Sequence, residues 1–432
     1  RWAGRGCRSR GVRGYPHGMK IVILGAGGVG TSMAAIAARR QFFEEIVLAD
    51  INTSVAEQAL GRIGDPRFSV RQQDASKIDE VVQLLESVGA SIVVNACDPR
   101  FNPAIFEAAS RAGVTYVDMA LSLSTPHPEH PYELPGLTLG ELQFDQHEAW
   151  NDRGQLALVG MGADPGLSNV FARYARDNLF RQIDEIGIRD GGNMKVDGYV
   201  FAPTFSIWTT IEECLNPPLI WKKGRGLYTT EPFSEPEIFR FPDGIGPVEC
   251  VNVEHEEVVM IPKWVDCSRV SFKYGLGREF IEVLRTLHLV GFDSTRTVRV
   301  GDSEVSPRDV AAATLPNPAL LGDRMHGKSC VGAYITGTAM DGSWREMYLY
   351  HVADNEVTMR EYGCQAVAWQ TAVNAVVALE LLAEGAWKGA GVLGPEAFFA
   401  NPFLELLGDY GTPHGIEDRT PGRVAGLGEL TR

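Results

Sequence analysis

The sequence predicts an α/β protein with a doubly wound parallel sheet, followed by an α+β domain. Three observations indicate this fold. A strand, a glycine-rich loop and a helix follow one another from residue 20 to residue 40, strands and helices then alternate up to about residue 166, and charged, alternating segments come after them. A chain of 432 residues is long enough for two or three domains.

The first strand and helix enclose a glycine-rich loop. Lys20 to Leu24 is a short apolar run, Gly25, Gly27 and Gly30 follow in a G-x-G-x-x-G pattern, and an Ala-rich helix ends at Arg40. The first glycine permits a tight turn, the second lets the backbone approach a pyrophosphate, and the third lets the helix pack close to the strand. With the free N–H groups of the helix start, this loop predicts a dinucleotide site.

An acidic residue ends the second strand. EIVLAD ends at Asp50, about 20 residues beyond the glycine loop, where a ribose-binding carboxylate is expected. No arginine follows within Ile51, Asn52 and Thr53 to receive a 2′-phosphate. The sequence therefore predicts NAD as the cofactor, with NADP as a possible one.

Strands and helices alternate up to residue 166. Apolar strands end near Asp74, at Asn95 and at Asp118, and LALVGMGADPG gives a last buried strand that leads into Asp164. Continuous apolar strands are covered on both faces, and ligands bind at their carboxyl ends. We therefore expect residues 19–166 to form a Rossmann domain.

The pattern changes after residue 166. Residues 167–361 contain alternating charged segments, and Asp341-Gly342 lies between two strands, which is a strong signal for a hairpin. A long apolar helix begins residues 362–432. We expect residues 167–361 to be an α+β domain, and residues 362–432 to pack back on the Rossmann domain.

Composition limits the possible functions. The net charge of -15 argues against nucleic-acid binding, because a phosphate-binding surface must be basic. No apolar run approaches the roughly 18–20 residues of a membrane helix, so no membrane contact is expected. Seven cysteines without a C-x-x-C pattern indicate a reducing compartment and hence a cytoplasmic protein. The histidines form no metal-ligand pattern, and no metal is expected.

The first 18 residues differ from the rest of the chain. They hold five arginines and no acidic residue. They also lack the apolar face of an amphipathic transit peptide. We expect residues 1–18 to be a disordered extension, with Met19 as the natural start.

Several segments together resemble the saccharopine dehydrogenase family, in particular its bacterial saccharopine dehydrogenase-like and lysine 6-dehydrogenase members. They extend from Met19 to about Phe403. YVDMA, the Asp-Pro-Gly and the late KGAGVLGPE are more specific than the glycine loop. The matching segments are MKIVILGAGGVG, VVNACDPRFNPAIFEAASRAGVTYVDMA, GADPGLSN, FAPTFSIWTTIEECLNPPLIWKKG and AVVALELLAEGAWKGAGVLGPEAF.

The resemblance implies NAD(P)-linked oxidation of a C–N bond to an imine, or the reverse reaction. The substrate would be saccharopine or lysine, with carboxynorspermidine and related polyamines as the alternative. The α+β domain would bind this small amine and pair two subunits into a homodimer. The residues at the dinucleotide would be Gly25, Gly27, Gly28, Val29, Gly30, Asp50, Asp74, Ala75, Asn95 and Ala96.

Amine oxidation needs a group that accepts the amine proton and negative charge near the iminium ion. The sequence offers acids at strand ends and in FSIWTTIEECLNPP. That segment has no counterpart of the arginine in the W-S-P-R-G pattern of fungal members, which can grip a substrate carboxylate, so a cationic amine is favoured. We predict catalytic roles for Asp118, Asp164 and Glu213, and substrate contacts for Asp190, Trp208 and Glu212.

Two other functions are open. Cys97 follows the strand VVNA and could be the thiol nucleophile of a different Rossmann dehydrogenase. The protein could also bind a dinucleotide without turnover, as a redox sensor. His255 could act as a general base because imidazole titrates near neutrality, although the alternating pattern of VEHEEV favours a solvated strand face.

Overall fold

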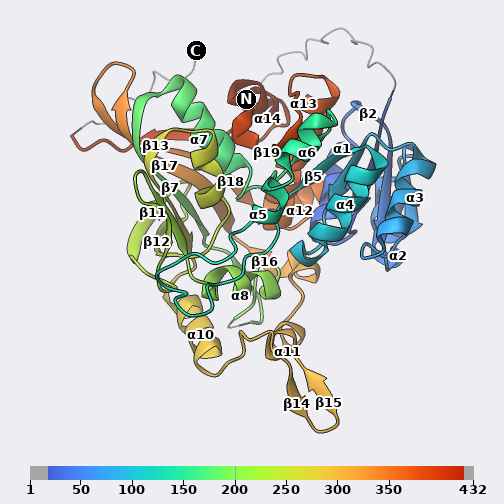
Figure 1. Cartoon of the computed structure of the whole chain (residues 1–432), viewed down its shortest axis with the longest axis horizontal. Helices are drawn as coiled ribbons and strands as arrows, with labels where there is room; N and C mark the ends of the chain where they lie inside the picture. The colour runs from blue at the N-terminus through green and yellow to red at the C-terminus, as the bar shows by residue number, and fades with distance from the viewer. Residues whose placement is uncertain (1–17, 200, 423–432) are drawn as a thin grey trace.

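The computed structural model describes residues 18–199 and 201–422. Almost all of the extension expected in residues 1–18 lies outside these ranges, so its predicted disorder stays a prediction. Two large sheets stand side by side, and the C-terminal helices (red) lie between them at the top of the view in Figure 1.

The first sheet is parallel and seven-stranded, in the order β3-β2-β1-β4-β5-β6-β19. This order confirms the predicted doubly wound sheet. All four residues from Ile21 to Leu24 are fully buried, which explains why this strand is apolar without alternation. The strands are β1 (Met19–Leu24), β2 (Phe43–Asp50), β3 (Phe68–Gln72), β4 (Ile92–Asn95), β5 (Thr115–Asp118), β6 (Leu156–Leu158) and β19 (Gly391–Leu393).

Helices flank this sheet, and several of them end as the sequence indicates. α2 and α4 end at Gly64 and Gly113, both in the left-handed conformation that glycine adopts without strain. The helices of this part are α1 (Gly28–Ala37), α2 (Thr53–Ile63), α3 (Ile78–Val88), α4 (Asn102–Ala112), α5 (Glu141–Phe144) and α6 (His147–Asp152), with a 3₁₀ turn η1 (Pro99–Phe101).

The second sheet is mixed. Its main path is β10-β9-β13-β7-β17-β18-β20, in which only β13 and β7 run parallel, while β12 pairs with β13 and β11. The hairpin expected at Asp341-Gly342 is confirmed as β17 and β18. The strands are β7 (Phe180–Gly192), β9 (Leu219–Lys222), β10 (Gly226–Thr229), β11 (Glu237–Phe241), β12 (Gly246–Asn252), β13 (Cys267–Gly275), β17 (Lys328–Ala339), β18 (Trp344–Asp354) and β20 (Gly415–Asp418).

Helices and short segments surround the second sheet. α7 contacts β7 and β17, and α9 contacts β13. The helices are α7 (Leu167–Asn178), α8 (Ile207–Leu215), α9 (Glu257–Met260), α12 (Asn355–Tyr362) and α14 (Ala400–Asp409), with the 3₁₀ turns η2 (Ile261–Lys263), η3 (Pro318–Leu320), η4 (Gly322–Arg324) and η5 (Pro395–Ala397) and the strand pair β8 (Lys195–Val196) and β16 (Met325–His326).

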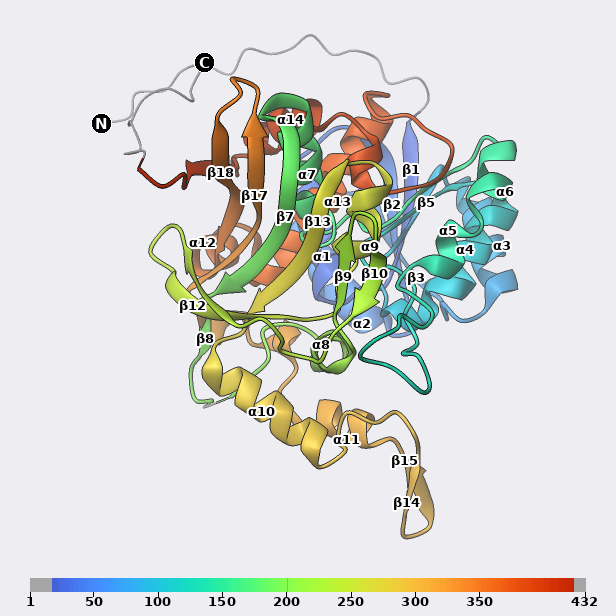
Figure 2. The ribbon, with the colours of Figure 1, turned by 60° about the vertical axis from the view of Figure 1, so that its left-hand side comes forward.

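An arm extends away from the body of the protein. It consists of α10 (Arg278–Leu289), the hairpin of β14 (Val298–Val300) and β15 (Ser303–Val305), and α11 (Pro307–Thr314), as Figure 2 shows. The chain returns along α11, which contacts α8. The segment after α11 then reaches the glycine loop, because a Cβ at Gly28 would lie 3.8 Å from the Cβ of Ala319.

The long helix α13 (Ala366–Ala383) packs against α1. Among the residues that the structure describes, it is long and apolar enough to cross a membrane by length and composition. The expectation that no such run exists is therefore wrong. Most of this helix is buried inside the protein, so its apolar composition is accounted for by the core it joins.

A buried ion pair ties α13 to the Rossmann domain. Arg40, just after α1, donates through Nε and Nη2 to the two carboxylate oxygens of Glu380 at 2.8 and 2.7 Å. The Tyr410 hydroxyl donates to the same carboxylate at 2.6 Å. The Glu380 side chain is only 6% exposed, so its charge depends on these donors.

We expect Glu380→Gln to lower the free energy of unfolding by about 1–3 kcal/mol, because it leaves the guanidinium of Arg40 without its carboxylate. Urea unfolding followed by circular dichroism measures this. Glu384→Gln, at the exposed end of the same helix, is the matched control and should change the value by less than about 0.5 kcal/mol. Equal effects of the two substitutions would contradict this account.

Candidate active site

A cavity of about 630 Å³ lies between the two domains at the glycine loop. We call it the large cavity. One wall is the Rossmann domain, through Gly27, Gly28, Val29, Asn95 and Ala96. The opposite wall comes from residues 205–209 at the start of α8, from residues 312–313 in the last turn of α11 and from residues 315–319 after it. The cavity thus lies at the carboxyl ends of β1 and β4, where doubly wound sheets bind ligands.

The glycine loop fits a dinucleotide. Gly25 has φ +100°, and a Cβ there would lie 2.6 Å from the Ala96 carbonyl oxygen. A Cβ at Gly30 would lie 1.9 Å from the Gly25 carbonyl oxygen, so both positions require glycine. Gly27 has open space around it, which lets a pyrophosphate approach the backbone. The first N–H groups of α1 have no partner within the helix and suit an anion.

Asp50 is held against the glycine loop. Its Oδ2 accepts a hydrogen bond from the Ala26 N–H at 2.7 Å, and its Oδ1 accepts one from the Asn52 N–H at 2.9 Å. A dinucleotide would be held by this loop and by the end of β4, and its ribose would meet Asp50. Asp74 lies apart from the large cavity, where it accepts hydrogen bonds from the Ser76 N–H and hydroxyl at 2.9 and 2.7 Å, and Ala75 does not line the cavity either.

Asn95 shapes the loop after β4. Its Oδ1 accepts a hydrogen bond from the Cys97 N–H at 3.0 Å, and its Nδ2 donates to Asn102 Oδ1 at 2.6 Å. Burial, together with the nearby carboxylates of Asp50 and Asp98, raises the pKa of the Cys97 thiol to about 12. Because the thiolate is the nucleophile, the structure argues against the thiol-dependent alternative.

The charged side chains that line the large cavity, among the described residues, are all acidic. Asp98, Asp164, Glu213 and Glu256 all line it, and its described lining residues include no lysine, arginine or histidine. Asp98 is paired with Arg100, whose Nε lies 2.8 Å from Asp98 Oδ1. The other three carboxyl groups lie toward the second domain. Burial raises the pKa of Glu213 to about 8 and also raises the pKa of Glu256.

Two aspartates share a hydrogen bond at the edge of this cavity. Burial raises the pKa of Asp164 well above its ordinary value, and it raises the pKa of Asp190 to about 6. The Asp164 carboxyl donates the hydrogen bond, so this pair keeps a proton near neutral pH. Asp164 follows β6 and Asp190 lies on β7, so the pair joins the two domains.

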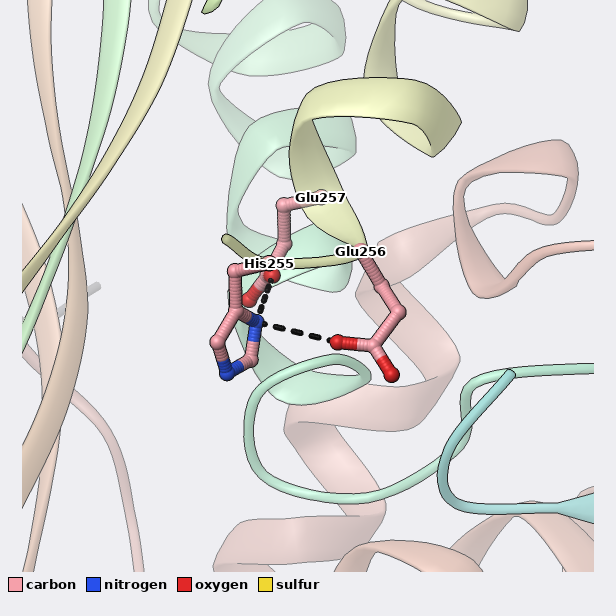
Figure 3. Close-up of side chains that lie close together, drawn as sticks. All are labelled: His255, Glu256 and Glu257. Carbon is pink, nitrogen blue, oxygen red and sulfur yellow. Dashed lines mark hydrogen bonds and ion pairs between the residues drawn. The ribbon is translucent and has the colours of Figure 1, made fainter. Parts of the chain in front are cut away.

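His255 is buried, so the solvated strand face expected for it is wrong. β12 ends at Asn252 and the chain turns into α9. The imidazole stacks on Phe272 with the ring centres 3.7 Å apart. Figure 3 shows its Nδ1 between two carboxylates, 2.6 Å from Glu257 Oε2 and 3.2 Å from Glu256 Oε2. The fold buries this charged run because its members compensate one another.

This triad is an ion cluster. Burial would lower the pKa of His255, but the carboxylates of Glu257 and Glu256 raise it well above its ordinary value. Ligand atoms of the three residues lie within 4.8 Å of one another, a spacing that a metal ion could use. The two carboxylates stabilise the protonated imidazole, so we assign His255 as the buried cation among these acids and not as a general base.

Sequence analysis also predicted site roles for Asp118, Glu212 and Trp208. Of these three residues, only Trp208 lines the large cavity. Asp118 is buried and accepts hydrogen bonds from the Gly160 N–H at 2.6 Å and Gln143 Nε2 at 2.8 Å, which fixes the end of β5. Glu212 forms an ion pair with Arg308. Neither acid lines the large cavity. Trp208 does line it, and the guanidinium groups of Arg100 and Arg308 lie 4.4 and 4.9 Å from the centre of its ring.

Sequence analysis did not identify Glu256 or the segment 312–319 as part of the cavity. The run EHEE between apolar residues was the available signal for Glu256, because four charged residues rarely enter a core unless they pair. No local pattern marks residues 312–319, which reach the cavity only because the arm folds back through α11.

Comparison with known families identifies both parts of the chain. Residues 21–158 match the saccharopine dehydrogenase NADP binding domain, and residues 162–412 match the saccharopine dehydrogenase C-terminal domain. The chain belongs to the saccharopine dehydrogenase family. It is therefore an NAD(P)-binding oxidoreductase, and the resemblance seen in the sequence is confirmed.

Named relatives within the saccharopine dehydrogenase family cover nearly the whole chain. A carboxyaminopropylagmatine dehydrogenase from Synechocystis is 31% identical over 404 residues, which are 91% of this chain and 96% of the relative. A carboxynorspermidine synthase from Vibrio alginolyticus is 28% identical over 418 residues, 94% and 98% of the two chains. The solved saccharopine dehydrogenase (L-Glu forming) of Saccharomyces cerevisiae shares the fold, with a TM-score of 0.65 at 14% identity over 93% of this chain and all of that one.

We expect Asp50 to favour NAD over NADP, because its carboxylate would accept the ribose hydroxyls and repel a 2′-phosphate. Asp50→Ala should reduce the ratio of kcat/KM with NAD⁺ to kcat/KM with NADP⁺. The expected reduction corresponds to a free-energy difference of about 1–3 kcal/mol. Asp50→Asn keeps an oxygen for the Ala26 N–H but removes the charge, so it separates repulsion from loop positioning. Equal or better use of NADP⁺ by the wild-type enzyme would refute the prediction.

Proposed function

We propose that this enzyme acts on the C–N bond of a carboxylated polyamine, which it oxidises to an imine or forms by the reverse reaction. The observation that carries this proposal is the lining of the large cavity. Beside the glycine loop it holds Asp164, Glu213 and Glu256, and its described lining residues contain no basic side chain. Such a cavity suits a substrate with several cationic nitrogens.

The relatives support the polyamine class over saccharopine and lysine. Two of them are named for carboxyaminopropylagmatine and carboxynorspermidine, which combine one carboxylated arm with a basic arm. Saccharopine carries several carboxylates. Burying these beside unpaired acids would cost free energy in the absence of a guanidinium partner, so the charge of the cavity also favours the polyamine alternative.

The reaction requires a side chain that accepts one proton in oxidation and returns it in the reverse direction. When bound, the nicotinamide accepts a hydride from the carbon next to nitrogen or returns it to the imine. In oxidation, the nitrogen must first lose a proton. Glu213 lies in the large cavity and has its pKa raised to about 8 by burial, so near neutrality it can accept this proton as a carboxylate and return it as an acid in the reverse direction.

A substrate panel tests the proposal. Carboxynorspermidine, carboxyaminopropylagmatine, saccharopine and lysine are compared with NAD⁺ and NADP⁺ by following nicotinamide absorbance. We expect kcat/KM for the two polyamines to exceed that for saccharopine and lysine by at least about tenfold, since each 1.4 kcal/mol of binding gives that factor. A preference for saccharopine or lysine would refute the polyamine class, and cofactor binding without any turnover would indicate a non-catalytic protein.

Glu213→Gln should lower kcat/KM for oxidation by about 10²-fold, because a general base contributes about that much or more. In the wild type, kcat/KM should rise as the pH approaches about 8, where Glu213 loses its proton. The variant should lose this inflection. Glu212→Gln makes the same change on the adjacent residue, which faces Arg308, and should keep it. An inflection that survives in Glu213→Gln would assign the proton to another group.

A further inference from the structure

A second, smaller cavity adjoins the large one. We call this space of about 140 Å³ the small cavity. Asp164 and Thr371 line both cavities, so the two meet at these residues. One wall of the small cavity is α13, through Val367, Gln370 and Thr371, which share a helix face at the spacing i, i+3 and i+4. Nothing in the proposed reaction has used this space.

Two well-buried polar side chains face the small cavity with free acceptor atoms. Gln370 is 2% exposed, and its Nε2 donates to His351 Nδ1 and to the His351 carbonyl oxygen, both at 3.0 Å. Its Oε1 has no hydrogen-bond partner within residues 18–199 and 201–422. Ser329 is 9% exposed, and its hydroxyl also has no partner in those ranges. Neither atom is among the fully buried unpartnered atoms of the described residues, so both are accessible from the small cavity and can accept hydrogen bonds from a ligand.

The small cavity is also acidic without a balancing cation. Asp164 and Asp190 line it, and no lysine, arginine or histidine belongs to its described lining. The nearby imidazolium of His255 is held by Glu256 and Glu257. Tyr274 also lines the small cavity. A cation with several N–H donors would meet both the charge and the free acceptors.

The size of the small cavity restricts what can enter it. A volume of about 140 Å³ accommodates the end of a chain, whereas the nicotinamide and the reacting C–N bond need the large cavity beside Gly27 and Asn95. Trp208 and the acid Glu213 lie on the large-cavity side. A linear substrate that passes Asp164 would therefore place its reacting nitrogen in one cavity and its far end in the other.

We propose that the small cavity binds the cationic terminus, ammonium or guanidinium, of the basic arm of the substrate. Asp190 supplies the charge, and Ser329 and Gln370 accept hydrogen bonds from the terminal nitrogen. Asp164 lies at the passage between the cavities. This inference rests on the proposed function, and it identifies which part of the structure selects a polyamine.

Three substrates with one reaction centre test the assignment. Carboxynorspermidine ends in an ammonium group, carboxyaminopropylagmatine ends in a guanidinium group, and a synthetic analogue of carboxynorspermidine ends in a methyl group. In the wild type, at least one cationic substrate should exceed the methyl analogue in kcat/KM by at least about tenfold. The ratio between the two cationic substrates tells which terminus the small cavity fits better.

Asp190→Asn should lower kcat/KM for the cationic substrates at least about tenfold more than it lowers kcat/KM for the methyl analogue. Ser329→Ala, a smaller change, should reduce the same preference by about three- to tenfold, the value of one ordinary hydrogen bond. This variant provides the test if Asp190→Asn does not fold. Asp184→Asn on the same strand β7 is the matched control and should leave the preference unchanged.

The outcomes separate this inference from the proposed function. Turnover of all three substrates with no preference in the wild type would overturn the small-cavity assignment alone. A uniform loss for all three in both Asp190→Asn and Ser329→Ala would also overturn it, since that is the effect of a structural role. Failure of the wild type to turn over any of them would overturn the proposed function, and the assignment with it.

Discussion

Burial of carboxyl groups is the constraint on which the site depends. Asp164, Asp190, Glu213, Glu256 and Glu257 lie at the junction of the two domains, and a buried carboxylate is unfavourable without a proton, a cation or hydrogen bonds. The imidazolium of His255 compensates the charge of Glu256 and Glu257, which lie against its Nδ1. Asp164 and Glu213 retain protons near neutrality because burial raises their pKa values, and Asp164 donates its proton in a hydrogen bond to Asp190. If the substrate is a polyamine, as proposed, its cationic nitrogens would take the place of these protons.

The cofactor side of the site could be predicted because its information is local. The strand, the spacing of Gly25, Gly27 and Gly30, and the acid that ends β2 all lie within one short segment, and each has one physical role. The parallel, doubly wound sheet followed from the regular alternation of strands and helices. Asp50 shows the limit of this reasoning, since its bond to the Ala26 N–H depends on how closely β2 and the loop approach.

The substrate side could not be predicted in the same way. Asp190 on β7, Ser329 on β17 and Gln370 on α13 meet only because β7 pairs with β17 and α13 packs across the sheet. His255 misled the sequence analysis because an alternating charged run normally faces water, whereas here Phe272 and two carboxylates make its burial tolerable. Glu212 and Glu213 are neighbours, yet one faces Arg308 and the other lines the large cavity. Helical rotation separates them, and only the structure shows which one turns inward.

The two domains contribute different parts of the site, and this division separates cofactor binding from substrate selection. The glycine loop and the end of β4 belong to the Rossmann sheet and concern only the cofactor. Much of the small cavity is lined by the second sheet and by α13, through a helix face at i, i+3 and i+4. Side chains there can change without disturbing the glycine loop, since no residue of that loop lines the small cavity. If the terminal cation binds there, as proposed, one hydride-transfer geometry can serve different amines, and the far end of the substrate, not the reacting bond, determines which amine is used.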